Sequence, residues 1–355
     1  MNTRRFTAVA ALALLAPLDA AAQGAVAPGE LGTPRAIVAA TVEKLKAHYV
    51  FPDVAAQVEV ALRKKVRSDR TIATADDARA FAQQLTAELQ SVAHDKHLRV
   101  AYSEAVLPQR TAAAPTAEEE ASLRGRMERG NHGVERVEHL PGNIGYIDLR
   151  VFAPLQWSAE TLSAAMTLVA GTDALVIDLR KNGGGDPSTV AFISSYLFDT
   201  RTHLNSLYFR EGDRTEQFHT LDWVPGRRFG QNKPVYVLTS SRTFSGAEEF
   251  TYNLKNLKRA TIVGETTGGG ANPGDLFPLD AHFEIFVPTG RAVSPITHTN
   301  WEGTGVAPDV KAGADDAFAV ARMLALKKLA GAQTQPERKA QLERLQQDPA
   351  ARGPD

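Results

Sequence analysis

The spacing of apolar residues predicts helices in the first part of the chain. Between residues 33 and 92, apolar positions recur every two to four residues, which is the spacing of amphipathic helices. Pro52 interrupts this pattern, and a further helix is expected to start at Thr74. These segments predict a small helical N-terminal domain over residues 30–108.

From residue 144 the pattern changes to short β-rich runs that alternate with helical ones. Strands are expected at 144–149, 174–179, 235–239, 260–264 and 282–287, and helices at 158–169, 190–197 and 246–257. This alternation is typical of a layered α/β domain, which we place at residues 132–328. Residues 109–131 contain few bulky apolar side chains, so a linker or surface excursion is expected there. The charged tail 329–355 is expected to be a peripheral helix followed by disorder.

The first 22 residues have the order of a secretory signal peptide. Arg4 and Arg5 precede an apolar run, and a small-residue stretch ends at Ala22. The apolar run is too short to span a bilayer, which takes roughly 20 apolar residues. We therefore expect cleavage after Ala22 and a periplasmic or secreted protein without membrane insertion.

Composition excludes several kinds of chemistry. The chain has no cysteine, so thiolate catalysis and zinc sites with Cys ligands are excluded. Lys and Arg total 40 against 41 for Asp and Glu, so there is no overall charge to attract nucleic acid or an anionic membrane. Neither is expected as a partner, no cofactor or metal is expected, and no feature specifies an oligomeric state.

Ser245 stands where a predicted buried strand gives way to a helix. A hydroxyl at such a junction lies near N–H groups and the positive end of the helix dipole, which stabilise developing negative charge. Helix capping is the more common role of such a serine. Thr243 and Ala247 occupy the glycine positions of a G-x-S-x-G elbow, so that motif is absent. The position of Ser245 leaves both roles open.

The predicted strand 174–179 runs into Gly183, Gly184 and Gly185. Glycines there let the backbone approach a ligand and turn its N–H groups toward an oxyanion, although glycine-rich turns after strands are common. A nucleotide-phosphate loop is disfavoured because neither G-x-G-x-x-G nor G-K-[ST] occurs.

His97 is the histidine best placed to act as a general base. It follows the last helix expected in the N-terminal domain and precedes a β-like run, where a side chain can face a cleft. A lone histidine more often has a structural or surface role. His94 and His97 could also form a metal pair, but no third ligand is evident in the local sequence.

Several motifs together resemble the tail-specific, or C-terminal-processing, serine peptidases. They are Asp178-Leu179-Arg180-x-Asn182-x-Gly184-Gly185, Ser245-x-x-Glu248, Lys258-Arg259-Ala260 and Gly264-Glu265-Thr266-Thr267. A second set resembles the branch related to interphotoreceptor retinoid-binding protein and the tricorn-type proteases. It comprises Tyr49-Val50-Phe51-Pro52, Asp95-Lys96-His97-Leu98-Arg99-Val100 and Asn300-Trp301-Glu302-Gly303-x-Gly305-Val306. The resemblance covers residues 33–326.

The resemblance implies an α/β fold of the crotonase or ClpP type, a spiral of β-β-α units, preceded by the helical domain. Many relatives carry a PDZ domain between these two parts. Only about fifty residues separate His97 from the strand at Gly145, so no PDZ domain is expected here.

The resemblance also implies a catalytic mechanism. Many relatives use a Ser-Lys dyad, but Gly270 stands where that lysine would be. The tricorn-like branch uses a histidine and a glutamate, and these roles fall on His97 and Glu302, with Ser245 as the nucleophile. Glu302 is expected to orient or stabilise the charge of the site and to raise the pKa of His97.

The backbone N–H groups of Gly246 and Gly184 are the expected oxyanion hole, with Gly185 as the fallback. The chain is thus expected to be an exported serine-type peptidase that acts on peptides or proteins.

Two other functions remain open. The retinoid-binding relatives hold apolar ligands, in which case Trp301, Phe277 and Phe286 would line a pocket. An acyl-thioester enzyme of the crotonase architecture would use the glycine N–H groups without Ser245. Retention of Ser, His and Glu together favours the hydrolase, since a binding pocket does not need all three.

Overall fold

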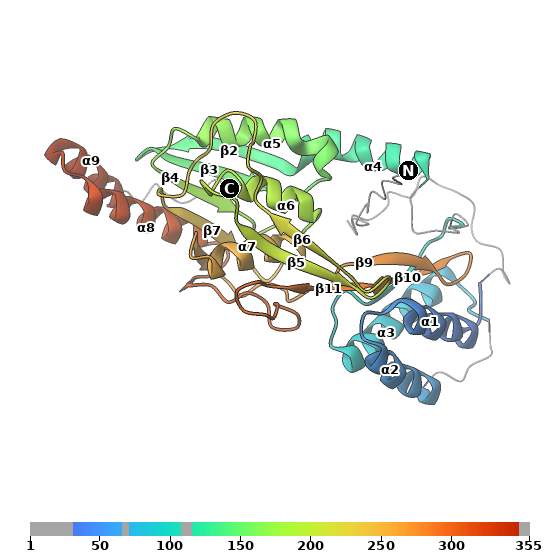
Figure 1. Cartoon of the computed structure of the whole chain (residues 1–355). Helices are drawn as coiled ribbons and strands as arrows, with labels where there is room; N and C mark the ends of the chain where they lie inside the picture. Colours follow the sequence, from blue (N-terminus) through green and yellow to red (C-terminus); the bar gives the residue numbers. More distant parts are fainter. Residues whose placement is uncertain (1–30, 66–70, 108–115, 348–355) are drawn as a thin grey trace, which may run out of the picture. The chain divides into compact units, whose positions relative to one another are not determined.

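The computed structural model describes residues 31–65, 71–107 and 116–347 (Figure 1). The expected signal peptide lies outside these ranges. The chain falls into two compact units, which we call the N-terminal and C-terminal units. The N-terminal unit comprises Met1–Thr116 with Leu207–Glu216 and Asn272–Ala292, and the C-terminal unit comprises Ala117–Ser206, Gln217–Ala271 and Val293–Asp355. The sequence had suggested that 207–216 and 272–292 belong with the α/β domain.

Three helices form most of the N-terminal unit, as the apolar spacing predicts. They are α1 (Pro34–His48), α2 (Pro52–Lys65) and α3 (Ala75–Ala93). Thr33 caps α1 by accepting the N–H of Ala36, and Thr74 caps α3 by accepting that of Asp77. Their apolar faces form one core, with Ile37, Leu45, Val58, Leu62, Leu85 and Leu89 all buried.

A three-stranded antiparallel sheet completes this core. Its order is β1 (Arg99–Tyr102), β10 (Phe283–Pro288) and β9 (Gly274–Pro278). Val100 pairs with Ile285, and both pack in the helical core. The sheet therefore joins segments almost 200 residues apart in sequence, and it includes the strand expected at 282–287.

The C-terminal unit is built on a six-stranded sheet. Its order is β12 (Val310–Lys311), β8 (Thr261–Gly264), β7 (Val235–Thr239), β4 (Ala174–Asp178), β3 (Ile144–Leu149) and β2 (Val134–Leu140). All neighbours pair in parallel except β2 with β3. Every residue of β4 and β7 is buried, which explains the continuous apolar runs in the sequence.

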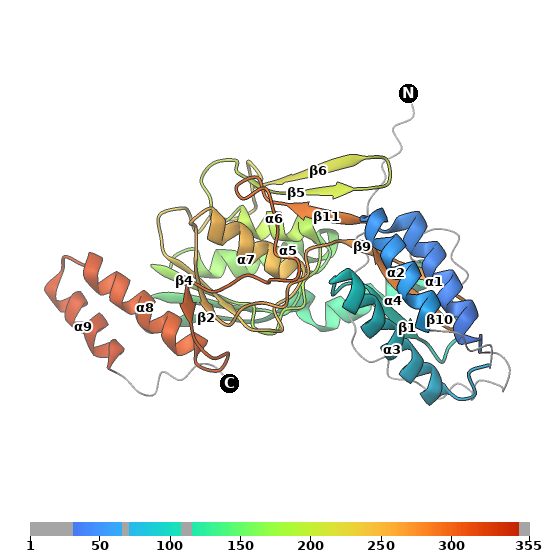
Figure 2. The same cartoon turned by 90° about the horizontal axis from the view of Figure 1, so that it is seen from below.

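Helices cover both faces of this sheet. The helices α5 (Leu155–Val169), α6 (Pro187–Ser194) and α7 (Gly246–Asn256) share a core with Ile147, Ile177 and Val237. On the other face, α8 (Ala317–Ala332) packs against Tyr146, Val176 and Leu238. Helix α9 (Pro336–Gln346) follows α8 and lies beside it, away from α5 to α7 (Figure 2). The expected α/β class with a helical N-terminal region is confirmed.

Two regions differ from the pattern expected from sequence. The range expected as a linker contains α4 (Ala117–Arg129), in which only Met127 is buried. The sheet of β11 (Gly290–Val293), β5 (His203–Phe209) and β6 (Arg214–His219) was not expected. Within the described ranges, no helix combines the length and apolar character needed to cross a membrane.

Helix α5 offers a direct test of the core. Leu162 is 2% exposed and Leu168 is 72% exposed on the same helix. Leu162→Ala should lower the free energy of unfolding by about 2–5 kcal/mol, because it leaves a cavity. Leu168→Ala should change it by less than about 0.5 kcal/mol. Urea unfolding of both variants checks this, and equal losses would contradict the assignment of this face of α5 to the core.

Candidate active site

Ser245 occupies the turn between β7 and α7 with an unusual backbone. Its φ is 53° and its ψ is −120°. An ordinary N-cap serine has extended backbone angles, and a non-glycine residue in this region costs roughly 1–3 kcal/mol. Strained turns of this kind, between a strand and a helix, present nucleophilic serines in other hydrolases. Helix capping alone therefore does not account for the conformation of Ser245.

The buried carboxylate of Glu248 holds this turn in place. Its Oε2 accepts the N–H of Ser245 at 2.9 Å and that of Gly270 at 2.8 Å. Its Oε1 accepts the N–H of Gly269 at 2.6 Å and the hydroxyl of Thr267. Burial raises the pKa of Glu248, and these hydrogen bonds act in the opposite direction. One side chain thus links the Ser245 turn to the glycine loop at 268–270.

Gly184 and Gly185 lie directly against Ser245 and Gly246. Both glycines have positive φ, 110° and 141°. A Cβ atom on Gly184 would lie 2.8 Å from Cβ of Ser245, and one on Gly246 would lie 2.9 Å from N of Gly185. Contacts this close exclude any side chain, so the approach of the two loops requires glycine at these positions.

The N–H groups of these glycines are not equivalent. Gly184 donates its N–H to Oδ1 of Asn182 at 2.8 Å. In the described part of the chain, no acceptor takes the N–H of Gly185 or of Gly246. Asn182 is fully buried, and its carbonyl also accepts the N–H of Phe244 at 3.1 Å. Asn182 therefore ties the glycine loop to the residue that precedes Ser245.

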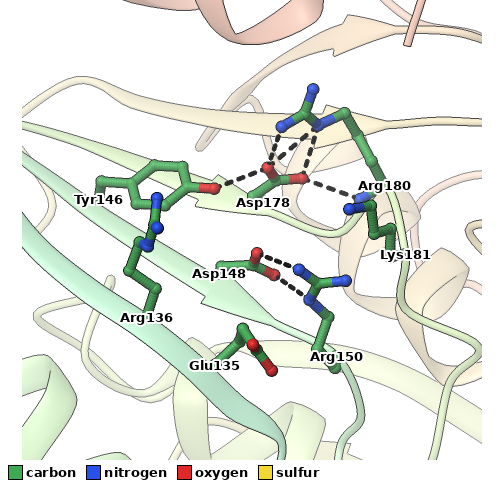
Figure 3. Close-up of a pocket in the computed structure, with 8 residues that line it drawn as sticks. All are labelled: Glu135, Arg136, Tyr146, Asp148, Arg150, Asp178, Arg180 and Lys181. Atoms are coloured by element: carbon green, nitrogen blue, oxygen red, sulfur yellow. Dashed lines mark hydrogen bonds and ion pairs between the residues drawn. The ribbon is translucent and has the colours of Figure 1, made fainter. Parts of the chain in front are cut away.

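A charged cluster supports the start of this loop (Figure 3). Asp178, at the end of β4, accepts the hydroxyl of Tyr146 at 2.8 Å and Nε of Arg180 at 2.9 Å. Arg180 donates to the carbonyl of Ala314 at 2.7 Å, and its own carbonyl accepts the hydroxyl of Ser240. The Asp178-Leu179-Arg180 motif thus anchors the segment that leads into Gly184.

Glu302 is anchored to the other end of the loop that Glu248 holds. Its Oε2 accepts the N–H of Ala271 at 2.6 Å. Beside it, Nε1 of Trp301 donates to the carbonyl of Gly270 at 2.7 Å. The C-terminal unit therefore brings Ser245, Gly269, Gly270 and Glu302 into one hydrogen-bonded set of loops.

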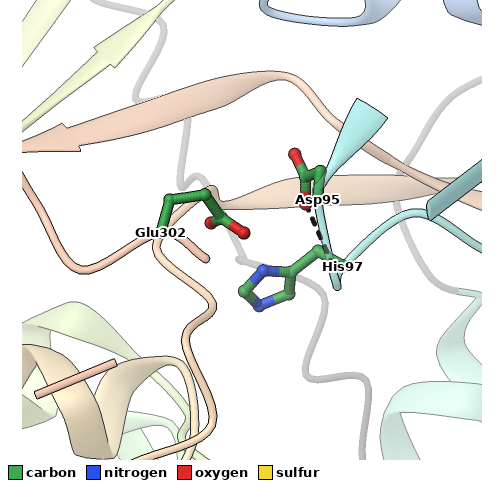
Figure 4. A group of neighbouring side chains, drawn as sticks. All are labelled: Asp95, His97 and Glu302. Atoms are coloured by element: carbon green, nitrogen blue, oxygen red, sulfur yellow. Dashed lines mark hydrogen bonds between the residues drawn. The ribbon is translucent and has the colours of Figure 1, made fainter. Parts of the chain in front are cut away.

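His97 lies in the N-terminal unit, in the turn between α3 and β1. Oδ1 of Asp95 accepts its backbone N–H at 3.0 Å (Figure 4). Oδ2 of Asp95 accepts the hydroxyl of Tyr49 at 3.1 Å and the amide of Asn272 at 2.9 Å. Glu302, also drawn in Figure 4, belongs to the C-terminal unit. Asp95 is buried, so these bonds fix the turn that carries His97.

Burial lowers the pKa of the His97 imidazole to about 4, and the charge of Arg99 adds to this effect. The expectation that a carboxylate raises this pKa is therefore wrong: desolvation is the dominant cause. Above about pH 5 the imidazole is neutral and can accept a proton. His94 is the exposed C-cap of α3, with φ 53°, so its evident role is to end the helix.

The sequence analysis gave no role to Asp95, which bonds to the turn of His97, or to Asn182, which bonds to Gly184. Asp95 stands two residues before His97, which is the spacing of a turn in which a side chain accepts a nearby backbone N–H. That spacing could have identified Asp95. Asn182 is a fixed position of the motif that ends in Gly184-Gly185, but its partners, Leu149 in β3 and Phe244 in the turn before α7, cannot be inferred from that motif.

Two family models match this chain. Residues 143–312 match peptidase family S41, and residues 32–128 match the N-terminal domain of Peptidase_S41 in eukaryotic IRBP. Carboxyl-terminal-processing peptidase 2 of Arabidopsis thaliana is 28% identical over 182 residues, which are 49% of this chain and 34% of that protein. A carboxy-terminal-processing protease of Bartonella bacilliformis is 26% identical over 49% of this chain and 39% of its own length. The chain thus spans between a third and two fifths of these curated relatives.

Solved structures share the fold at low sequence identity. A candidate peptidase of Parabacteroides merdae superposes with a TM-score of 0.53 at 17% identity, over 79% of this chain and 90% of that one. A lipoprotein of Streptococcus agalactiae gives 0.51 at 14% identity, over 86% of this chain and 100% of that one.

The role of Glu248 can be tested by substitution. Glu248→Gln replaces one acceptor oxygen with an NH₂ group that faces N–H donors, so the free energy of unfolding should fall by about 1–3 kcal/mol. Glu160→Gln, at an exposed position on α5, should leave it unchanged. Urea unfolding measures both, and a Glu248→Gln protein as stable as the parent would show that this carboxylate does not hold the turn.

Proposed function

Because the chain belongs to peptidase family S41, with an N-terminal domain of the IRBP type, we propose that it hydrolyses peptide bonds with Ser245 as nucleophile. The observation that carries this proposal is the strained backbone of Ser245, at φ 53° and ψ −120°, packed against Gly184 and Gly185. A capping serine needs neither the strain nor the glycine contact. A nucleophile that attacks beside an oxyanion hole benefits from both.

In the proposed reaction, Ser245 Oγ attacks the carbonyl carbon of the peptide bond and His97 takes the hydroxyl proton. The C–N bond then breaks, and His97 returns the proton to the leaving amine. In the second half of the reaction, water attacks the acyl carbon, His97 takes a proton from this water, and the proton returns to Ser245 Oγ as the acyl group leaves. A neutral His97 suits this role, because its imidazole is ready to accept a proton at neutral pH.

The developing oxyanion is assigned to the N–H groups of Gly246 and Gly185. Gly184 was the first expectation, but its N–H already donates to Asn182. Asn182 instead supports the glycine loop, and the N–H of the next residue, Gly185, lies against the turn that carries Ser245. Two preorganised backbone donors are the usual form of an oxyanion hole.

Glu302 is proposed as the carboxylate that stabilises the imidazolium during attack. Its bond to Ala271 sets its position independently of substrate. The loop at 268–270, where the lysine of a Ser-Lys dyad would stand, carries only glycines and is held by Glu248. These contacts support a Ser-His-Glu site.

Peptides or proteins are the proposed substrates, and export to the periplasm or beyond is part of the proposal. The signal-peptide pattern of the first 22 residues supports export. That substrates reach the site without capture by a PDZ domain stays a prediction.

Binding of an apolar ligand is the second function to consider. The residues expected to line such a pocket have packing roles: Trp301 donates its indole N–H to Gly270, and Phe277 stacks on His48 at 4.2 Å. Phe286 is buried with its ring 5.8 Å from that of His97. These contacts favour the peptidase over the binding module.

A thioester enzyme is the third function to consider. It would need only the glycine N–H groups, so it would not explain the strained backbone of Ser245.

Removal of the nucleophile is the primary test. Ser245→Ala should abolish peptide hydrolysis and fluorophosphonate labelling, while the free energy of unfolding falls by at most about 0.5–2 kcal/mol, the value of a cap. Ser241→Ala, in the same turn but exposed, is the matched control and should keep full activity. Normal hydrolysis by Ser245→Ala would show that another group attacks the substrate.

The roles of His97 and Glu302 are tested together. Glu302→Gln should keep the fold and lower kcat by about 10² or more, because a preorganised charge is lost. His97→Ala should cost at least as much, and the double variant should lose little more than the worse single one, since members of one catalytic unit are non-additive. Steady-state kinetics measures all three. Multiplicative losses, or full activity in Glu302→Gln, would make Glu302 structural.

A further inference from the structure

Three buried polar side chains meet at the first turn of α7, outside the roles assigned above. They are Glu249 and Asn253 on α7 and Asn205 on β5, and each is at most 4% exposed. Both asparagine amides face the Glu249 carboxyl closely enough to act on its pKa. Even so, Oε1 of Glu249 and the side-chain N and O atoms of both asparagines make no well-aligned hydrogen bond to another described residue.

The environment of Glu249 disfavours its ionised form. Phe250 and Leu254 on the same helix, and Leu204 beside Asn205 on β5, belong to the apolar core. The positive end of the α7 dipole favours a carboxylate in the first turn. The effect of burial is larger than the effects of the helix dipole and of the two amides, and it raises the pKa of Glu249 to about 8. The charged group that acts on it is Asp186, whose negative charge adds to the effect.

Glu249 is connected to both halves of the proposed site. Its backbone N–H donates to the carbonyl of Ser245 at 2.9 Å, so it belongs to the turn that presents the nucleophile. Asp186 follows Gly185 and donates its N–H to the carbonyl of Phe152 at 2.8 Å, while Phe152 donates to Gly184. A negative charge on Glu249 would repel Asp186 and thereby strain the glycine loop as well as the helix.

We propose that Glu249 is a positioning residue for Ser245 and the glycine loop. Its neutral carboxyl keeps the first turn of α7 seated in the core, and loss of its proton at alkaline pH displaces this turn and lowers the reactivity of Ser245. The proposal rests on the proposed function of Ser245 as the nucleophile.

The effects on stability and on reactivity have different pH windows. In the unfolded chain Glu249 loses its proton near the ordinary glutamate pKa of 4.5, whereas in the folded chain it keeps the proton to about pH 8. Stability therefore falls as pH rises from about 4.5 to 8 and is level above that range. Reactivity depends on the folded protein alone, so it falls only around and above pH 8.

The experiment compares the parent with Glu249→Gln, which keeps the shape of the side chain and cannot ionise. The melting temperature and the rate constant of fluorophosphonate labelling at Ser245 are measured from pH 5 to 9.5. From pH 7 to 9 labelling of the parent should slow about tenfold, since one unit above its pKa only about a tenth of Glu249 stays neutral. Labelling of Glu249→Gln should change less than about twofold, and its melting temperature should lack the fall between pH 5 and 8.

Two further variants sharpen the comparison. Glu160→Gln, exposed on α5, should follow the parent at every pH. Asp186→Asn keeps a good helix cap but removes the negative charge that helps to raise the pKa of Glu249, so its loss of labelling should shift to lower pH.

Parallel pH curves for the parent and Glu249→Gln would overturn the proposal. So would a difference in melting temperature without one in labelling, because Glu249 would then titrate without positioning Ser245. A parent protein that is not labelled at any pH would instead refute Ser245 as nucleophile, and the positioning role with it.

Discussion

The hydrogen bonds of the Glu248 carboxylate tie the Ser245 turn to the glycine loop at 268–270, and the geometry of the candidate site depends on them. The carboxylate accepts the N–H of Ser245 on one side and those of Gly269 and Gly270 on the other. Burying a carboxylate is unfavourable unless its oxygens are hydrogen-bonded, and here four donors satisfy them. The same bonds offset the strain of a serine at φ 53°. Glu302 gains its position from the loop that Glu248 orders.

The parts of the fold that sequence predicted well are those buried on both sides. The strand at 235–239 agrees with the structure to the residue and the one expected at 174–179 differs by one residue, because both are parallel strands whose residues are all buried. The strand at 144–149 also agrees to the residue. Helix α4 and strand β6 were missed for the opposite reason. Only Met127 of α4 is buried and no residue of β6 is, so neither segment carries a clear apolar period.

For the candidate site, too, some features could be predicted from the sequence and others could not. The motif resemblance pointed to Ser245, His97, Glu302 and the glycines at 184, 185 and 246, because it depends only on residue types and their order along the chain. It could not select between Gly184 and Gly185, because that choice depends on whether Asn182 takes the N–H of Gly184. Nor could it give the direction of the His97 pKa, which is set by the apolar surroundings of the folded chain.

Glu248 and Glu249 show how far environment decides the role of a residue. They are adjacent, identical in type and both buried, and burial raises the pKa of each. Glu248 meets backbone N–H groups and a hydroxyl, which favour the charged form and make it a fixed acceptor. For Glu249, burial outweighs the two amides that favour the charged form, and the charge of Asp186 adds to burial, so the neutral form is preferred at pH 7. Because a helix turns about 100° per residue, one step along α7 moves a carboxyl from the site into the core.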